Sequence, residues 1–162
     1  ICSTRVQTGH GMPTLQSVMD CASLDGAAII ADGGIKTAGD IVKSLAAGAD
    51  FVMLGSLLAG TDESPGDVLS STDEKKYKVY RGMASVEAQV DWRGVARSLE
   101  GVSTTIPYKG SVKEIVNNLE SNIRSGLSYS GARTISEFQA RANFVQQSSA
   151  GQFESSTHIL SK

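Results

Sequence analysis

Ala-Ala-Ile-Ile-Ala-Asp, residues 27–32, is an apolar run that ends in a carboxylate and is followed by two glycines. A short continuous run of this kind is typical of a strand that is buried on both faces. Residues 37–47 then show the spacing of an amphipathic helix, and residues 50–54, Asp-Phe-Val-Met-Leu, form a second apolar run that ends at Gly55. Strand, helix and strand joined by short connections predict a parallel α/β sheet.

Further helices are predicted on either side of this unit, at residues 14–22, 112–127 and 135–142. Residues 61–110 contain few apolar runs, and a segment of that length is usually a functional loop rather than part of a core. Two strands cannot close a β/α barrel, which needs eight such units. The chain also begins at Ile1 rather than at a methionine. We therefore expect residues 1–162 to be the C-terminal portion of a single barrel domain whose other strands lie upstream.

The composition excludes some classes of partner. The 162 residues include 15 Lys and Arg against 17 Asp and Glu, for a net charge of -2. This balance argues against a protein that binds nucleic acid or an anionic membrane, which needs a basic excess. No apolar run approaches the ~20 residues needed to cross a bilayer. The two cysteines, Cys2 and Cys21, fit neither a metal-ligand spacing nor a disulfide framework, so we expect a reduced, cytoplasmic setting.

Polar and glycine residues follow both predicted strands, as Asp32-Gly33-Gly34 and as Gly55-Ser56. In α/β barrels, ligands lie at the carboxyl ends of the strands, and a phosphate often rests on the glycine-rich loops after the last two. Glycines let backbone N–H groups approach phosphate oxygens, and a carboxylate accepts hydrogen bonds from ribose hydroxyls. The same glycines are equally explained as tight turns between strand and helix.

Cys2 lies in Ile-Cys-Ser-Thr-Arg, residues 1–5. Cysteine is strongly nucleophilic near neutral pH, and its thiolate is the reactive form. A lone cysteine beside an apolar residue is nevertheless more often a buried structural thiol. The residue types alone therefore leave both interpretations open.

Four motifs stand in order along the chain: Ile-Cys-Ser-Thr-Arg at 1–5, Ile-Ala-Asp-Gly-Gly-Ile-Lys at 30–36, Val-Met-Leu-Gly-Ser-Leu-Leu-Ala-Gly-Thr at 52–61 and Tyr-Arg-Gly-Met at 80–83. Residues 106–110, Ile-Pro-Tyr-Lys-Gly, follow them. In this order they resemble the catalytic loop, the two phosphate loops and the purine-binding segment of the IMP dehydrogenase/GMP reductase family. The resemblance covers nearly the whole chain and implies the C-terminal part of a (β/α)8 TIM barrel.

The resemblance also implies roles for individual residues. The sulfur of Cys2 would attack C2 of the purine of IMP or GMP, and hydride would pass to or from a nicotinamide cofactor. Thr4 and Glu100 resemble a pair that relays a proton near the reacting carbon. Residues implied to bind the substrate are Asp32 at the ribose, Gly33, Gly34, Gly55, Ser56 and Tyr80 at the phosphate loops, and Gly82, Met83 and Glu100 around the purine.

A cation site and an assembly are implied in the same way. Carbonyl groups of the Cys2 loop, with Glu154, Ser155 and Ser156 of a neighbouring subunit, resemble a potassium site. Members of the family are usually homotetramers that share sites between subunits.

The direction of the reaction depends on the segment 82–101. The dehydrogenase branch oxidises IMP to XMP with NAD and needs an activated water, for which a mobile flap supplies an Arg-Tyr pair. Here that segment is short and contains no such pair, which resembles GMP reductase, an NADPH-dependent enzyme that converts GMP to IMP. Residues 55–66 and 149–155 resemble the dehydrogenase more closely. Because more of the chain supports it, we predict IMP dehydrogenase, with Arg93 or the Thr4–Glu100 pair as the water activator. The alternatives are GMP reductase and a non-catalytic purine nucleotide binder.

Overall fold

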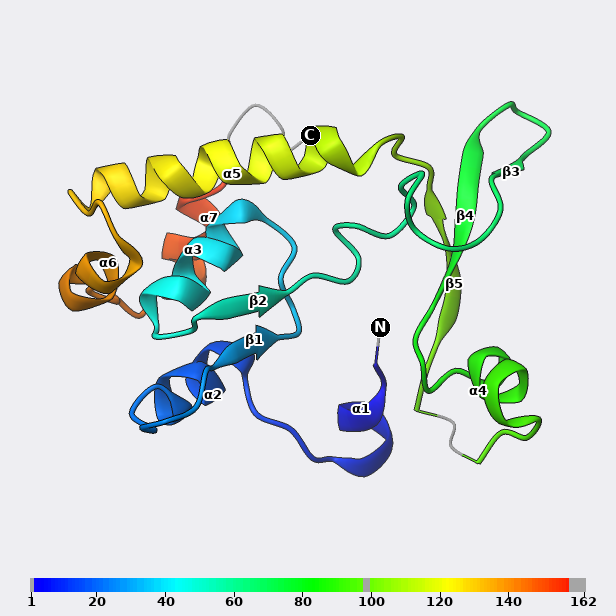
Figure 1. Ribbon diagram of the computed structural model, residues 1–162, viewed down its shortest axis with the longest axis horizontal. Coiled ribbons are helices and arrows are strands. Elements are labelled where there is room, and N and C mark those ends of the chain that lie inside the picture. Colours follow the sequence, from blue (N-terminus) through cyan, green and yellow to red (C-terminus); the bar gives the residue numbers. More distant parts are fainter. Residues whose placement is uncertain (1, 98–99, 158–162) are drawn as a thin grey trace.

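The computed structural model describes residues 2–97 and 100–157. Seven helices and five strands are assigned in these ranges (Figure 1): α1 (Thr4–Thr8), α2 (Thr14–Cys21), β1 (Ile30–Asp32), α3 (Ala38–Ala46), β2 (Phe51–Met53), β3 (Leu69–Ser70), β4 (Lys76–Arg81), α4 (Val86–Arg93), β5 (Ser103–Pro107), α5 (Val112–Tyr129), α6 (Ile135–Arg141) and α7 (Ser149–Glu154). No helix in these ranges has the length and apolar character that crossing a bilayer demands.

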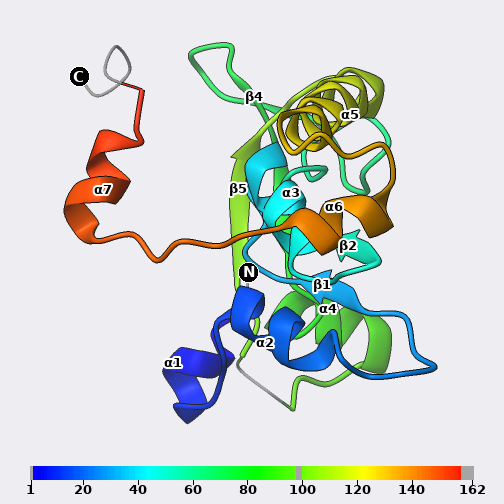
Figure 2. The same ribbon diagram turned by 90° about the vertical axis from the view of Figure 1, so that its left-hand side faces the viewer.

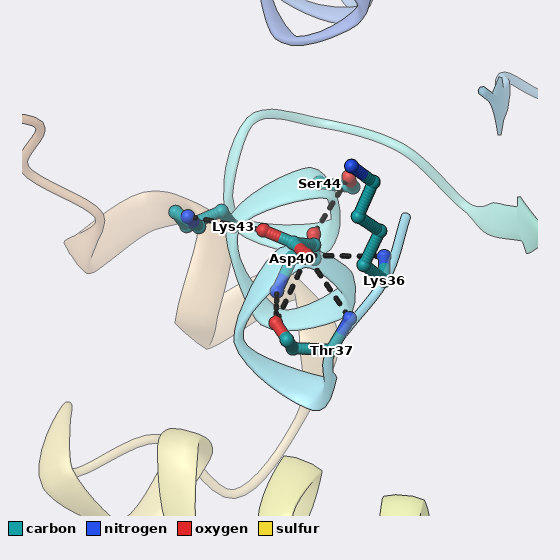
Figure 3. A network of polar contacts seen from close by, with 5 residues as sticks. All are labelled: Lys36, Thr37, Asp40, Lys43 and Ser44. Carbon is teal, nitrogen blue, oxygen red and sulfur yellow. Dashed lines mark hydrogen bonds and ion pairs between the residues drawn. The ribbon is translucent and has the colours of Figure 1, made fainter. Parts of the chain in front are cut away.

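The predicted strand–helix–strand unit is present. β1 and β2 pair in parallel, with Ile30 opposite Phe51 and Asp32 opposite Met53, and α3 connects them. Helix α3 begins at a capping box, in which the Thr37 hydroxyl accepts from the Asp40 N–H and the Asp40 carboxylate accepts from the Thr37 N–H (Figure 3). Such reciprocal bonds satisfy donors that a helix start leaves open. The predicted bounds of α2, α3, α5 and α6 agree with the structure to within two residues.

One hydrophobic cluster holds this unit together. Helices α2, α3 and α6 contribute Val18, Ile41 and Phe138, all less than 5% exposed, and β1 contributes Ala31. Helix α5 packs along α3 (Figures 1 and 2), where Leu119 and Ile123 lie against the cluster. The helices therefore cover one face of the β1–β2 pair.

The other face of the β1–β2 pair is open, which corrects the expectation of strands buried on both faces. Ile30, Phe51 and Met53 are 53%, 60% and 51% exposed. Side chains alternate between the faces of a strand, so these three lie on the side away from Ala31 and the helices. Two strands alone do not close a barrel, and in the described residues nothing covers this face.

Residues 61–110 hold more regular structure than the sequence predicted. Strands β3, β4 and β5 form an antiparallel sheet in the order β3-β4-β5, next to the N-terminal end of α5 (Figure 1). Strand β4 has the sequence Lys-Tyr-Lys-Val-Tyr-Arg. Its three charged residues interrupt the apolar run by which a buried strand is predicted. Lys78, in the middle of this strand, is only 3% exposed.

Candidate active site

Cys2 lies at one end of a short chain of side-chain hydrogen bonds. Its Sγ is 2.9 Å from the Thr4 hydroxyl, which donates to a Glu100 carboxylate oxygen at 2.5 Å. Thr4 is the first residue of α1, whereas Glu100 is 96 residues away in sequence. The structure therefore brings together the three residues that the sequence assigned to the chemistry.

The backbone holds this arrangement in place. Cys2 pairs with Gly101 in an antiparallel β-bridge, and the Ser3 N–H donates to the Glu100 carbonyl at 2.8 Å. The Ser3 hydroxyl donates to the same carbonyl at 2.7 Å. These contacts join the main chain at residues 2–3 to the main chain at residues 100–101. The distance between the Cys2 Sγ and the Glu100 carboxylate therefore does not depend on the side-chain bonds alone.

The surroundings of Cys2 favour its thiolate. The Thr4 hydroxyl, when it donates to the sulfur, and then the Thr4 N–H, at 3.4 Å, lower the pKa of the Cys2 thiol below its ordinary value. Some desolvation of the thiolate and the nearby Glu100 carboxylate oppose this effect and are outweighed. The residue is exposed, so the interpretation of Cys2 as a buried structural thiol is wrong. An accessible thiol with a lowered pKa is the environment of a reactive cysteine.

Tight packing of Gly101 places Glu100 beside Thr4. A Cβ on Gly101 would lie 1.9 Å from the Ser85 nitrogen and 2.1 Å from the Ala84 carbonyl carbon, so only glycine fits there. The Gly101 N–H donates to the Ala84 carbonyl at 3.1 Å. The end of the segment that follows β4, at Gly101, thus packs against its beginning at Ala84 and Ser85, and this brings Glu100 to α1.

Arg93 lies at the other end of that segment, in the last turn of α4. Its guanidinium stacks on the ring of Trp92, 4.3 Å from the ring centroid, and Trp92 is 67% exposed. Within the described ranges its contact is with this ring and not with the Cys2–Thr4–Glu100 chain. The structure gives no support to Arg93 as a water activator.

The loop after β1 has the features of an anion site. Gly33 and Gly34 have φ values of 109° and 75°, a region that disfavours other residues. In the described parts of the chain, neither glycine N–H has a hydrogen-bond acceptor. The start of α3 is different, because Asp40 already accepts from the N–H groups of Lys36 and Thr37 (Figure 3). The two glycines therefore offer donors to a phosphate, whereas the N–H groups of Lys36 and Thr37 are already used.

The loop after β2 lies against β4. A Cβ on Gly55 would lie 2.9 Å from the Tyr80 hydroxyl, so the hydroxyl sits directly over this glycine. Among described residues, the N–H groups of Gly55 and Ser56 have no acceptor. Successive unpaired N–H groups form a concavity that suits an anion. Gly55, Ser56 and Tyr80, which the sequence assigned to one phosphate, are therefore neighbours.

Asp32 and the purine-binding segment are both accessible. Asp32 borders an open cavity of about 390 Å³ that Arg5 and Thr14 also line. The Gly82 N–H donates to the Val102 carbonyl, and the Gly82 carbonyl accepts from the Ser85 N–H. Met83 is 74% exposed. Met83 is the better placed of the two to offer backbone groups to a ligand, and both roles remain predictions.

The predicted potassium ligands Glu154, Ser155 and Ser156 lie at the end of α7. The Ser155 hydroxyl donates to the Gly151 carbonyl at 2.8 Å and accepts from Gln147. Residues 2–97 and 100–157 contain no group of three His, Cys, Asp or Glu side chains that could hold a metal ion. Because the predicted site combines two subunits, it stays a prediction.

Sequence reasoning missed two lysines that hold the loop after β2. Lys109 Nζ donates to the carbonyls of Ser56 and Leu57 at 2.7 and 3.1 Å. Lys78 Nζ donates to those of Thr61 and Ser64 at 2.8 and 2.7 Å. Membership of the Ile-Pro-Tyr-Lys-Gly motif could have pointed to Lys109. No motif of the sequence points to Lys78.

Comparison with known proteins identifies the family. The IMP dehydrogenase / GMP reductase domain matches residues 1–158. An inosine-5'-monophosphate dehydrogenase of Nitrosopumilus maritimus is 48% identical over 98% of this chain and 36% of its own length. A GMP reductase of Leishmania major is 49% identical over 100% of this chain and 35% of its own length.

A solved structure agrees with these matches. GMP reductase from Trypanosoma brucei, in complex with guanosine 5'-monophosphate, superimposes with a TM-score of 0.91 at 45% identity, over 98% of this chain and 34% of that one. The chain spans about a third of the length of these relatives. It belongs to the IMP dehydrogenase/GMP reductase family.

Proposed function

We propose that this chain carries the covalent chemistry of a purine nucleotide oxidoreductase. The observation that supports this most is the hydrogen-bonded chain from Cys2 through Thr4 to Glu100. The Cys2 thiolate would attack C2 of a purine 5'-monophosphate, while the nucleotide is held through its phosphate by the loops after β1 and β2. A non-catalytic binder would have no need for an exposed thiol of lowered pKa in this position.

GMP reductase is the direction that we favour. Its reaction begins when Sγ adds to C2 of GMP, and the C2 amine then leaves as ammonia after it gains a proton. The thiol proton would pass through the Thr4 hydroxyl to the Glu100 carboxylate as the thiolate forms, and Glu100 would return it by the same route to the leaving amine. A nicotinamide cofactor, NADPH in this branch, would supply hydride to C2. The C–S bond then breaks and IMP is released.

The short segment 82–101 favours the reductase. Gln89, 4% exposed, donates to the Ala84 carbonyl and accepts from the Arg97 N–H, both at 2.9 Å, so α4 closes this segment onto itself. It contains no Arg-Tyr pair to activate water, and Arg93 contacts Trp92. An unactivated water is a poor nucleophile, because a positioned base typically contributes about 100-fold or more.

IMP dehydrogenase, the direction predicted from the sequence, is the second candidate. Its particular support was the likeness of residues 55–66 and of the tail to dehydrogenases. That support is weakened, because GMP reductases of Leishmania match the whole chain at 49% and 47% identity, as highly as the dehydrogenases. In this branch the Thr4–Glu100 pair would activate the water. A homotetramer with a shared potassium site is proposed for either branch.

One assay with the full-length protein distinguishes the two directions. Nicotinamide absorbance at steady state is followed with GMP plus NADPH and, separately, with IMP plus NAD. We expect turnover in the first mixture alone. Turnover in the second alone would establish the dehydrogenase, and nucleotide binding without turnover in either would establish a binder.

A further inference from the structure

Lys109 reaches across from the connection between β5 and α5 to the loop after β2. Its ammonium donates to two successive main-chain carbonyls, those of Ser56 and Leu57, and its own N–H donates to the Gly60 carbonyl at 2.9 Å. Partial burial of the ammonium lowers the pKa of Lys109. The side chain thus gives up some hydration in order to hold these two carbonyls.

Fixing a carbonyl also fixes the N–H of the same peptide unit. In a trans peptide the C=O and N–H point in opposite directions, so the bond to the Ser56 carbonyl turns the Leu57 N–H away from Lys109. The next two N–H groups, of Leu58 and Ala59, are used on the Gly55 carbonyl. Among the residues that the structure covers, the N–H groups of Gly55, Ser56 and Leu57 have no acceptor.

The loop does not need Lys109 to keep its place. Lys78 anchors it further along, at Thr61 and Ser64. Thr61 forms a β-bridge with Gly110, and the Glu63 carboxylate accepts from the Val112 N–H at 2.8 Å. These contacts fix residues 61–64, so the particular effect of Lys109 falls on the two peptide units at 56–58.

We propose that Lys109 is a positioning residue for the nucleotide phosphate: it holds the Ser56 and Leu57 carbonyls, so that the Leu57 N–H is directed at the 5'-phosphate beside those of Gly55 and Ser56. The inference rests on the proposed function, because it concerns the phosphate loop of the same site. The charge of Lys109 adds to the effect, since an ammonium one peptide unit away attracts the dianion.

The test uses Lys109→Met in the full-length protein, with two ligands that differ only in the phosphate. We expect the Kd of GMP to rise about tenfold or more, as for loss of a charge-assisted contact, and the inhibition constant of guanosine to stay unchanged. The KM for GMP should rise with little change in kcat, because the phosphate is bound equally in the ground and transition states. Lys109→Arg, which keeps the charge, should fall between wild type and Lys109→Met.

Tyr108→Phe is the matched control. Tyr108 is the neighbouring residue and donates to Asp62 at 2.5 Å, so this variant loses a bond to the same loop but outside residues 55–57, and should bind GMP as the wild type does. The inference is overturned if Lys109→Met binds both ligands as well as wild type, weakens both equally, or unfolds. Wild-type protein that binds no purine nucleotide would instead overturn the proposed function itself, and the inference with it.

Discussion

At the level of single residues, the chemistry depends on one hydroxyl between a thiol and a carboxylate. Thr4 contacts both partners, at 2.9 Å from the Cys2 sulfur and 2.5 Å from the Glu100 carboxylate. Cys2 and Glu100 could be assigned from the sequence only through their motifs, because they lie at opposite ends of a 98-residue separation and periodicity says nothing about such pairs. The glycine at 101 explains their approach, and its packing is visible only in the fold.

Replacing Thr4 with valine should break the hydrogen-bonded connection between the Cys2 thiol and the Glu100 carboxylate. Since the Thr4 hydroxyl lowers the pKa of Cys2, its loss raises that pKa, and the pH at which the thiolate forms moves upward. We expect turnover to fall by about 100-fold, as for loss of a proton relay. The pH dependence of alkylation of Cys2 by iodoacetamide measures the pKa independently of turnover. Thr4→Ser should behave like wild type, and a Thr4→Val profile that coincides with wild type would contradict the relay.

Gly101→Ala tests the packing that places Glu100. The added methyl would lie 1.9 Å from the Ser85 nitrogen, so the backbone has to shift. We expect a loss of about 1–3 kcal/mol in the free energy of unfolding and a marked fall in turnover. Chemical denaturation measures the first. Gly39→Ala is the control, because its Cβ would meet only the Thr37 hydroxyl at 3.6 Å in a helical position, where alanine is favoured by up to about 1 kcal/mol. Equal stability of the two variants would refute the packing argument.

At the level of elements, helix α3 was predicted well and the antiparallel sheet was not. Thr37 and Asp40 are a local signal, readable from spacing, for a helix start. Strands β4 and β5 pair residues such as Lys78 and Ile106, far apart in sequence, and the burial of Lys78 depends on carbonyls of another loop. A polar strand stabilised by distant partners leaves no periodic pattern, and for that reason the sequence predicts a loop at residues 61–110 where the structure has a sheet.

Asp40→Asn should weaken the start of α3. Burial alone would raise the pKa of Asp40, but hydrogen bonds from the Lys36 N–H and the Thr37 hydroxyl, and the Lys43 ammonium, leave it lowered. A lowered folded pKa means that the carboxylate stabilises the protein above its unfolded pKa, and that this stability is lost as pH falls below about 4.

The expected result at pH 7 is a loss of about 1 kcal/mol in the free energy of unfolding, typical of a helix cap. Urea titrations at neutral and acidic pH give the comparison. The gap between Asp40→Asn and wild type should close in acid, and a gap that stays constant with pH would show that the charge of Asp40 has no part in it.

At the level of the whole molecule, the exposed face of the β1–β2 pair is the face that carries the site residue Asp32. Ile30 and Asp32 lie on the same side of β1, as do Phe51 and Met53 on β2. In a closed barrel these apolar residues would fill the interior, and Asp32 would stand at its carboxyl-end rim. The two strands and their helix could be predicted because each is encoded by neighbouring residues, as an apolar run or as helical spacing. The burial of the strands depends on contacts with strands that the described residues do not include.

The central claim is that the Cys2 thiolate forms the bond to the purine. The most direct measurement is the rate of NADPH oxidation with GMP by full-length protein carrying Cys2→Ala, beside Cys21→Ala as the control cysteine. We predict that Cys2→Ala binds GMP but shows no turnover, and that Cys21→Ala keeps both. Turnover by Cys2→Ala at a rate near that of wild type would contradict the account.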